Sequence, residues 1–288
     1  ILSNDLKIKT SQICLFRTEY DAINKILDIF VPKYQEIISQ YPCWPYFYLI
    51  SKERKINIKY ILIKKIDEFN IQPKLMDIKN NLTSKTKLIY LSSPNTVSGQ
   101  SIKKEEFEKY LKDIPDNVVI LIDQRFYDFS NNTSFNPLNY LNHNIIILRS
   151  FNNFYGLENL ELSYVIANEE IIEFIKKTQV LNNIDYFNDT LAVVAYNDKK
   201  HYENIRTQIE EEKNKYTSLF DRNNIRYFPS ETNYMLVETN QSKDDVAKLL
   251  EKEDIMLYES NDGYNKYWTL PISKPEINNK IIDALLIN

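Results

Sequence analysis

Glycine is scarce in this sequence, with 3 glycines among 288 residues, and a phosphate-binding loop built from several glycines is missing. Gly99 and Gly156 each follow a short apolar run and stand in a polar turn. Because glycine adopts backbone conformations that other residues tolerate badly, we expect the local backbone to require both. The sequence also lacks histidines, cysteines and carboxylates at metal-ligand spacing. It therefore predicts neither a glycine-rich nucleotide site nor a metal centre.

Long apolar runs and a strong net charge are missing as well. No run approaches the ~20 apolar residues that span a bilayer, and we expect no signal peptide. A net charge of −4 offers no electrostatic basis for binding nucleic acid or an anionic membrane. Cys14 and Cys43 have the spacing of neither a disulfide framework nor a metal site. We therefore expect a cytoplasmic protein with no nucleic-acid or membrane partner.

Short apolar strands alternate with helices over most of the chain. Strands are expected at Ile13–Phe16, Tyr60–Lys64, Lys87–Leu91, Val118–Ile122, Asn144–Leu148 and Leu162–Ala167. Helices are expected at Asp21–Phe30, Leu75–Leu82, Lys103–Leu111 and Glu169–Lys177. This alternation, with apolar and β-branched strands, predicts an α/β fold whose mostly parallel sheet is covered by helices on both faces.

The pattern changes near residue 195. A long charged helix is expected at Lys200–Asn223, and two further helices at Lys243–Glu251 and Glu276–Leu286. Strands are expected at Tyr234–Val237, Ile255–Leu257 and Tyr267–Pro271. The sequence therefore predicts a large domain over residues 1–195 and a small C-terminal α+β domain over residues 196–288.

Polar side chains end three consecutive strands of the expected sheet. They are Ser93-Pro94-Asn95, then Asp123, then Arg149-Ser150. Because ligands in open α/β sheets bind at the carboxyl ends of the strands, these residues are candidates for one binding site. Each also has a purely structural interpretation. Asn95 belongs to a common turn signal, and Asp123 can be a turn carboxylate neutralised by Arg149 or Arg125.

Three segments, taken in order, carry a family resemblance: SPNTVSG (Ser93–Gly99), ILIDQRFYDF (Ile120–Phe129) and LRSFNNFYGLENLELSY (Leu148–Tyr164). Together they resemble the core of fold-type I pyridoxal-phosphate (PLP) aminotransferases, and among these histidinol-phosphate aminotransferase and threonine-phosphate decarboxylase. The resemblance covers the chain from Ile13 onward. It implies a three-layer large domain with a small C-terminal α+β domain. It also implies an N-terminal segment that closes over the substrate, and we expect this segment to be absent.

The resemblance implies roles for five side chains. Asn95 matches the asparagine that binds the phenolic oxygen of PLP, and Asp123 matches the carboxylate that keeps the pyridine nitrogen protonated. Trp44 falls where an aromatic side chain stacks on the PLP ring, although the sequence favours packing in the core or in an interface over that role. Ser150 matches a hydroxyl that helps to hold the phosphate. Asn233 falls where the family has an asparagine near the substrate.

Other positions depart from the family pattern. Asn153 stands at the position of the Schiff-base lysine, and a carboxamide can neither form an aldimine nor shuttle the proton. Glu161 stands where the family has a phosphate-binding arginine, which would place a negative charge against a dianion. Asn152 replaces a phosphate-holding serine, Phe126 a tyrosine that flanks the aspartate, and Thr18 a glycine of the first phosphate loop.

The arginines that bind the substrate carboxylate would fall near Tyr258 and Thr269, and neither of these residues is basic. We therefore expect an aminotransferase-like protein that is catalytically inactive, holds no covalent PLP, and acts by ligand binding or as a non-catalytic subunit. Replacing Asn153 with lysine and Glu161 with arginine is expected to restore PLP binding if the cleft keeps its shape. The alternatives are an active PLP-dependent aminotransferase or decarboxylase of an amino acid or its phosphate ester, and a cleft that binds another small molecule without chemistry.

The family resemblance also predicts the assembly. Fold-type I aminotransferases are two-fold dimers with active sites at the subunit interface, and the segments Tyr41–Tyr48 and Ile184–Phe187 resemble family segments near that interface. Exposing an apolar interface to water costs free energy, so we expect the subunits to remain paired even if the chain has lost its catalytic activity. We expect a homodimer, or a heterodimer with an active paralogue that carries the lysine.

Overall fold

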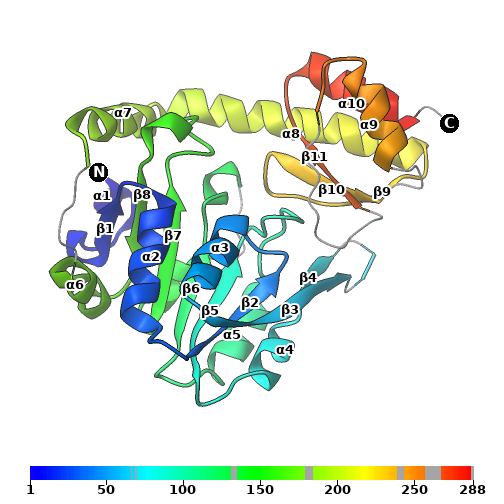
Figure 1. Ribbon diagram of the computed structural model, residues 1–288. Coiled ribbons are helices and arrows are strands. Elements are labelled where there is room, and N and C mark those ends of the chain that lie inside the picture. Colours follow the sequence, from blue (N-terminus) through cyan, green and yellow to red (C-terminus); the bar gives the residue numbers. More distant parts are fainter. Residues whose placement is uncertain are drawn as a thin grey trace.

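The computed structural model describes residues 1–65, 67–68, 70–130, 135–178, 184–238, 243–256 and 267–286. Its largest element is an eight-stranded sheet in the order β1-β8-β7-β6-β5-β2-β3-β4 (Figure 1). Strands β7, β6, β5, β2 and β3 are parallel, and β1, β8 and β4 join the sheet by antiparallel pairing. The strands are β1 Ile13–Phe16, β2 Glu36–Tyr41, β3 Asn57–Lys65, β4 Ile71–Pro73, β5 Thr86–Ser92, β6 Val119–Asp123, β7 Ile145–Ser150 and β8 Ser163–Ile166. The predicted mostly parallel sheet is confirmed.

Helices cover both faces of this sheet. One face packs against α2 Glu19–Phe30, α3 Pro45–Glu53 and α6 Glu169–Thr178. The other packs against α4 Leu75–Asn80, α5 Lys104–Leu111 and α7 Tyr186–Asn197. Successive residues of a strand alternate between the two cores: Leu88 and Tyr90 of β5 face the first, and Ile89 and Leu91 face the second. Burial on both faces explains why the strands read as continuous apolar runs.

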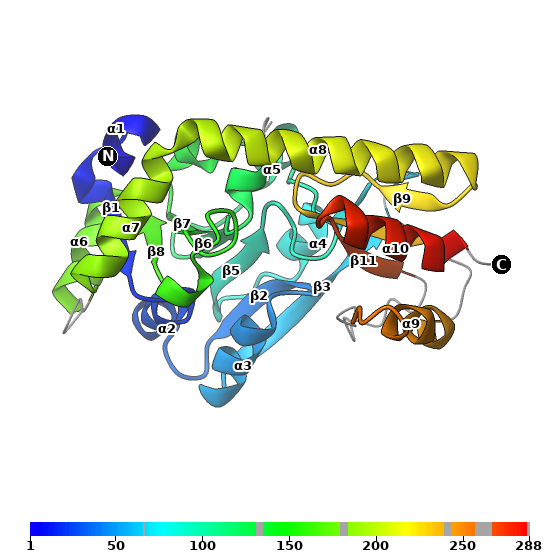
Figure 2. The same ribbon diagram turned by 90° about the horizontal axis from the view of Figure 1, so that it is seen from above.

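A second, three-stranded antiparallel sheet lies in the C-terminal part, in the order β11-β10-β9. Its strands are β9 Arg226–Phe228, β10 Tyr234–Glu238 and β11 Tyr267–Pro271, and its helices are α9 Lys243–Glu251 and α10 Pro275–Leu286. The long helix α8, Lys199–Arg222, extends above the large sheet to this small sheet (Figures 1 and 2). Its first half packs on the large core through Tyr202 and Ile205, and its second half on the small core through Tyr216 and Phe220.

Several elements differ from the sequence-based expectation. The strand expected at Ile255–Leu257 is wrong at Ile255 and Met256, which lie outside any strand, and Leu257 lies outside the described residues. Strands β2, β4 and β9 and helices α1 (Leu2–Leu6), α3 and α7 were not predicted. Helix α3 lies inside the aromatic, proline-containing segment: Pro45 occupies its first turn, where proline is tolerated, and Phe47 and Ile50 bury one side. Short helix α1 Leu2–Leu6 and the 3₁₀ turns η1 Thr10–Gln12, η2 Tyr127–Phe129, η3 Pro137–Tyr140 and η4 Glu158–Leu160 complete the described elements.

The carboxyl ends of β5, β6 and β7 lie side by side and position the candidate site. Ser92 pairs with Asp123, and Asp123 pairs with Leu148. Beyond β5 the backbone N–H of Ser93 donates to the carbonyl of Asp123 at 2.9 Å. The loop after β5 also touches the C-terminal part, because the N–H of Glu231 donates to the carbonyl of Gly99 at 2.8 Å. The site therefore lies between the large sheet and the small one.

Candidate functional site

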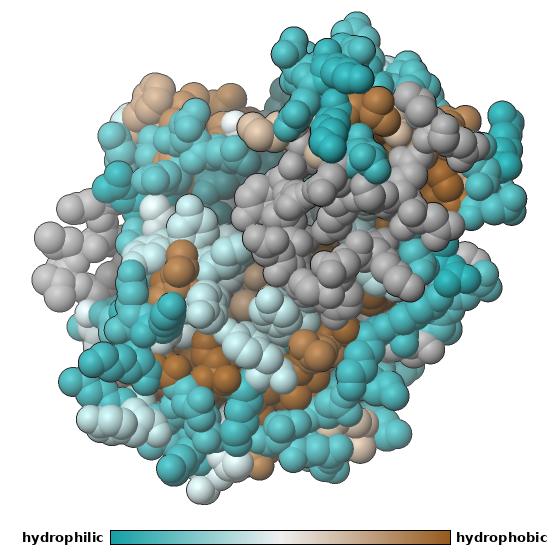
Figure 3. All heavy atoms as spheres, turned by 45° about the vertical axis from the view of Figure 1, so that its right-hand side comes forward, coloured by the Kyte–Doolittle hydropathy of each residue, from teal (hydrophilic) through white to brown (hydrophobic). Residues whose placement is uncertain are grey.

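A cleft of about 950 Å³ opens at this edge of the sheet. The N-terminal part of the chain lines it with residues 41–45 and Tyr48, with Tyr60 of β3, and with residues 96–97, 125–126 and 153, which follow the ends of strands β5, β6 and β7. The C-terminal part lines it with Tyr234, Met256, Thr269 and Pro271. Many of these side chains are aromatic. In Figure 3, the face that comes forward carries pale and brown side chains toward its middle and teal ones around its rim.

The structure brings some of the sequence-predicted site residues into this cleft. Trp44, Phe126, Asn153 and Thr269 line it. Asp123, Asn95 and Ser150 are almost fully buried at the strand ends beside it. Glu161 lies elsewhere, on the turn before β8, where its side chain is 46% exposed and pairs with Arg17 at 3.2 Å. Tyr258 lies outside the described residues.

Asp123 is held by a neighbouring arginine. Arg125 donates from Nε to Oδ1 of Asp123 at 2.9 Å and from Nη2 to Oδ2 at 2.8 Å, and its backbone N–H donates to Oδ1 at 3.1 Å. The hydroxyl of Tyr90 donates to Oδ2 as well. The side chain of Asp123 is 1% exposed and that of Arg125 is 6% exposed, so the two form a buried, bidentate ion pair. Both carboxylate oxygens of Asp123 are thus already bonded within the chain.

Electrostatics keep Arg125 charged. Burial lowers the pKa of the Arg125 guanidinium, but the charge and hydrogen bonds of Asp123 more than offset this and raise it overall. Burial, and then the negative charge of Asp123, hold the pKa of Tyr90 well above its ordinary value. Arg125 therefore stays cationic, and Tyr90 stays a neutral hydrogen-bond donor. Arg149, the other candidate partner of Asp123, instead donates to Oε1 of Gln124 at 2.9 and 3.1 Å and stacks on Tyr127.

Trp44 stacks on the same arginine. The guanidinium carbon of Arg125 lies 3.8 Å from the centroid of the Trp44 ring. At this distance a planar cation is attracted to the electron-rich face of the indole. Trp44 precedes helix α3, and Arg125 follows β6, so the contact joins two separate segments. The face of Trp44 is therefore in contact with a group of the chain itself.

Asn95 forms a turn. Its Oδ1 accepts from the backbone N–H groups of Val97 at 2.9 Å and Ser98 at 3.0 Å, as an aspartate or asparagine does at the start of such a turn. Its Nδ2 is buried, and within the described ranges it has no hydrogen-bond partner. The same holds for Thr96 Oγ1 and the Tyr60 hydroxyl, both of which belong to residues that line the cleft. Since buried polar atoms are normally paired, these three need explaining.

A carboxylate lies where the resemblance implies the phosphate site. The Nδ2 of Asn152 donates to both carboxylate oxygens of Glu19, at 2.9 and 3.0 Å. The backbone N–H of Asn152 donates to Ser150 Oγ at 3.0 Å. Glu19 is 8% exposed and begins helix α2, directly after its N-cap Thr18. Sequence reasoning missed Glu19, although its position next to Thr18 was a signal that could have found it.

The described lining of the cleft offers no ready nucleophile. The Asn153 amide nitrogen lies 3.5 Å from the carbonyl oxygen of Arg125, at the outer limit of a hydrogen bond. No lysine is among the described residues that line the cleft. Burial raises the pKa of the Cys43 thiol to about 11, so it carries a proton at neutral pH. The arrangement can bind a molecule by stacking and hydrogen bonding.

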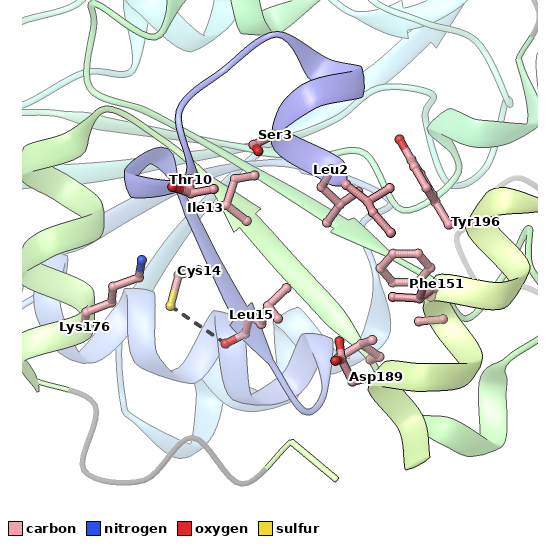
Figure 4. A pocket seen from close by; sticks show the side chains of 14 residues that line it. Leu2, Ser3, Thr10, Ile13, Cys14, Leu15, Phe151, Lys176, Asp189 and Tyr196 are labelled. Carbon is pink, nitrogen blue, oxygen red and sulfur yellow. Dashed lines mark hydrogen bonds between the residues drawn. The ribbon is translucent and has the colours of Figure 1, made fainter. Parts of the chain in front are cut away.

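A second cavity of about 420 Å³ lies beneath α1 and beside β1 (Figure 4). Leu2, Phe151 and Tyr196 gather on one side of it, and Lys176 and Asp189 lie on opposite sides. It contains none of the predicted site residues. Within the described ranges, the chain holds no group of three or more metal-ligating side chains and no helix long and apolar enough to cross a membrane.

Comparisons with known proteins show the family and the fold of the chain. The family model "Aminotransferase class I and II" matches residues 2–262. Histidinol-phosphate aminotransferase 2 of Haemophilus influenzae is 26% identical over 283 residues, which are 96% of this chain and 76% of that protein.

Two solved structures share the fold. Histidinol-phosphate aminotransferase from Clostridium acetobutylicum has a TM-score of 0.87 and 23% identity, covering 99% of this chain and 85% of that one. L-threonine-O-3-phosphate decarboxylase from Porphyromonas gingivalis has a TM-score of 0.79 and 17% identity, with the same coverage. The fold predicted from the three sequence segments is confirmed.

Proposed function

Since this chain belongs to the aminotransferase class I and II family, we propose that it is a non-catalytic member that binds a small molecule in the cleft. The observation that carries the proposal is the side chain of Asn153, which lines the cleft at the position of the family lysine. Without an amine there, or a thiolate at Cys43, the described lining has no group that would form a covalent intermediate with a substrate.

The described residues do not fit PLP as a bound cofactor. Both oxygens of Asp123 already accept hydrogen bonds, and the face of Trp44 already stacks on Arg125. At the phosphate end, Asn152 is bound to the buried carboxylate of Glu19. A dianionic phosphate is not stabilised by carboxylates. The contacts that would hold the ring and the phosphate of PLP are therefore already taken by groups of the chain.

The lining favours an uncharged, planar ligand. Aromatic rings from Tyr41, Tyr48, Tyr60, Phe126 and Tyr234 surround the space. Among the described lining residues, Arg125 alone is charged, and Asp123 balances it. The unpaired Nδ2 of Asn95 can donate, and the hydroxyls of Tyr60 and Thr96 can donate or accept. Stacking surfaces with a few polar groups are typical of small-molecule sites.

An active PLP-dependent aminotransferase or decarboxylase is the second candidate. The shared fold and the retained Asn95 and Asp123 favour it. It would need an amine from a residue outside the described lining, and a rearrangement that frees Asp123 from Arg125. The two candidates differ in whether the purified protein forms a covalent bond with PLP.

The first prediction tests this difference. Incubated with PLP and then dialysed, the protein should lose all bound PLP and show no aldimine absorbance band, because the described cleft offers no amine. Borohydride treatment followed by intact-protein mass spectrometry should find the unmodified mass. Lysozyme incubated in parallel controls for adventitious labelling of surface lysines. A stoichiometric adduct at one lysine, or transamination of any amino acid, would refute the non-catalytic proposal.

We further propose that the chain pairs, as a homodimer or with an active paralogue, in the cytoplasm. Large apolar side chains lie exposed in both segments predicted for the interface: Tyr46 is 54% exposed, Tyr186 84% and Phe187 60%. Tyr46 lies on α3, and the other two begin α7. Exposed apolar side chains of this size, grouped at two places, are typical of surfaces that another chain covers.

The second prediction concerns this pairing. Sedimentation velocity at micromolar concentration should give a dimer, and Tyr46→Glu with Phe187→Glu should give a monomer, because charges placed in an apolar interface lose their hydration. Tyr34→Glu is the matched control, since Tyr34 is 86% exposed and lies outside both segments. A wild-type monomer that also fails to pair with lysine-bearing paralogues would contradict the proposal.

A further inference from the structure

We propose that the chain fills its own cofactor site, with the guanidinium of Arg125 in the place of the pyridine ring and the carboxylate of Glu19 in the place of the phosphate. The inference rests on the proposed non-catalytic function and explains how the cleft excludes PLP. It assigns a role to two residues for which the sequence resemblance implied none.

Arg125 makes both contacts that the resemblance assigns to the ring. A protonated ring nitrogen would donate to Asp123, and the guanidinium donates to both oxygens of that carboxylate, at 2.9 and 2.8 Å. The ring would stack on an aromatic side chain, and the guanidinium lies 3.8 Å from the Trp44 centroid. A guanidinium is planar, cationic and rich in N–H donors, so it satisfies a carboxylate and an aromatic face at once.

Glu19 makes the contact that the resemblance assigns to the phosphate. It is a buried anion whose two oxygens accept from the amide of Asn152, which stands at the phosphate-holding position before Asn153. It also follows Thr18, the position of the first phosphate loop. Burial lowers the pKa of Arg125, and the negative charges of Asp123 and Glu19 both raise it. A cation at one end and an anion at the other reproduce the charge pattern of the cofactor.

This arrangement changes what a repair of the site requires. Asn153→Lys with Glu161→Arg, called here the repaired variant, supplies an amine in the cleft and the arginine that the resemblance implies at position 161. It leaves Arg125 on Asp123 and Glu19 on Asn152. We therefore expect the repaired variant to bind PLP no better than the wild-type chain. The cleared variant adds Arg125→Ala and Glu19→Ser to the repair, and so frees the ring and phosphate positions together.

The third prediction compares these variants with PLP as the probe. All proteins are purified in millimolar PLP, dialysed, and examined by absorbance and by mass spectrometry after borohydride. The cleared variant should form a stoichiometric adduct at position 153, and by equilibrium dialysis it should bind PLP about 100-fold or more tightly than the repaired variant. The repaired variant with Arg149→Ala is the matched control, because Arg149 is equally buried and stacked but does not contact Asp123. It should bind no better than the repaired variant.

Each other outcome decides against the inference. If the repaired variant binds as tightly as the cleared one, Arg125 and Glu19 do not fill the site. If the cleared variant folds but binds no PLP, or does not fold even in millimolar PLP, the cofactor cannot replace the two side chains, and the inference is wrong. A covalent adduct in the wild-type chain would instead refute the proposed non-catalytic function, so the two failures are distinguishable.

Discussion

Arg125→Ala is expected to lower the free energy of unfolding by about 3–5 kcal/mol, because it leaves the carboxylate of Asp123 buried without its cation. Asp123 is 1% exposed, and after the substitution its side chain would keep, among its described hydrogen bonds, the hydroxyl of Tyr90 and the backbone N–H of residue 125. The measurement is urea unfolding at pH 7, followed by circular dichroism. A loss of this size is a large share of the stability of a typical domain.

A double-mutant cycle separates the buried charge from lost packing. Asp123→Asn combined with Arg125→Ala removes both charges, so the double variant should be more stable than Arg125→Ala alone. If the double variant is the less stable of the two, the uncompensated charge is not the cause of the loss. Arg125→Lys should fall between wild type and alanine, since an ammonium keeps the charge but not the planar, two-pronged contact.

Gly99→Ala is expected to destabilise the chain by about 2–4 kcal/mol, from a strained backbone and a collision together. The φ of Gly99 is +68°, and a Cβ there would lie 2.0 Å from Ser230 Oγ and 2.9 Å from Ser230 Cβ. The loop after β5 would have to move away from the C-terminal part, and this loop carries Thr96 and Val97 of the cleft wall. The same urea unfolding measures the loss.

Gly156→Ala is the matched control for this substitution. Gly156 has nearly the same φ, +66°, but a Cβ there meets nothing within 4 Å. It should cost about 1–2 kcal/mol, which is the backbone strain alone. The difference between the two variants isolates the contact between the loop after β5 and Ser230. Equal losses would mean that this contact is easily relieved.

The fold was largely predictable because its strongest signals are local. Strands β1 and β11 and helix α9 have the bounds that their apolar periodicity predicted. Burial on both faces made the central strands continuous apolar runs, which are easy to recognise. Strand β2 was missed because its apolar pair, Ile37 and Ile38, is short and flanked by polar residues, and its identity comes from pairing with β3 and β5. Pairing between strands distant in sequence leaves little local signal.

The sequence predicted where in the sheet the candidate site lies, but it did not predict which side chains contact each other there. Asn95, Asp123 and Ser150 were expected at one edge of the sheet, and the parallel pairing of β5, β6 and β7 places all three strand ends there. Arg149 and Arg125 were equal candidates as the partner of Asp123. The distinction between them depends on where each guanidinium points, and this is set by the surrounding packing, with Trp44 beneath one and Tyr127 beneath the other.

By itself, the sequence determined which chemical groups the site has available: a carboxamide at Asn153 in place of an amine, and three strands that end in polar residues. The functional group of a side chain follows from the residue type alone and does not depend on the fold. The tertiary structure alone decided which groups meet. Asn152 and Glu19 stand 133 positions apart, and the stacking of Arg125 on Trp44 joins a loop after β6 to the start of α3. Hydrogen bonds and stacking act over a few ångströms, so they depend on the folded positions of the two partners.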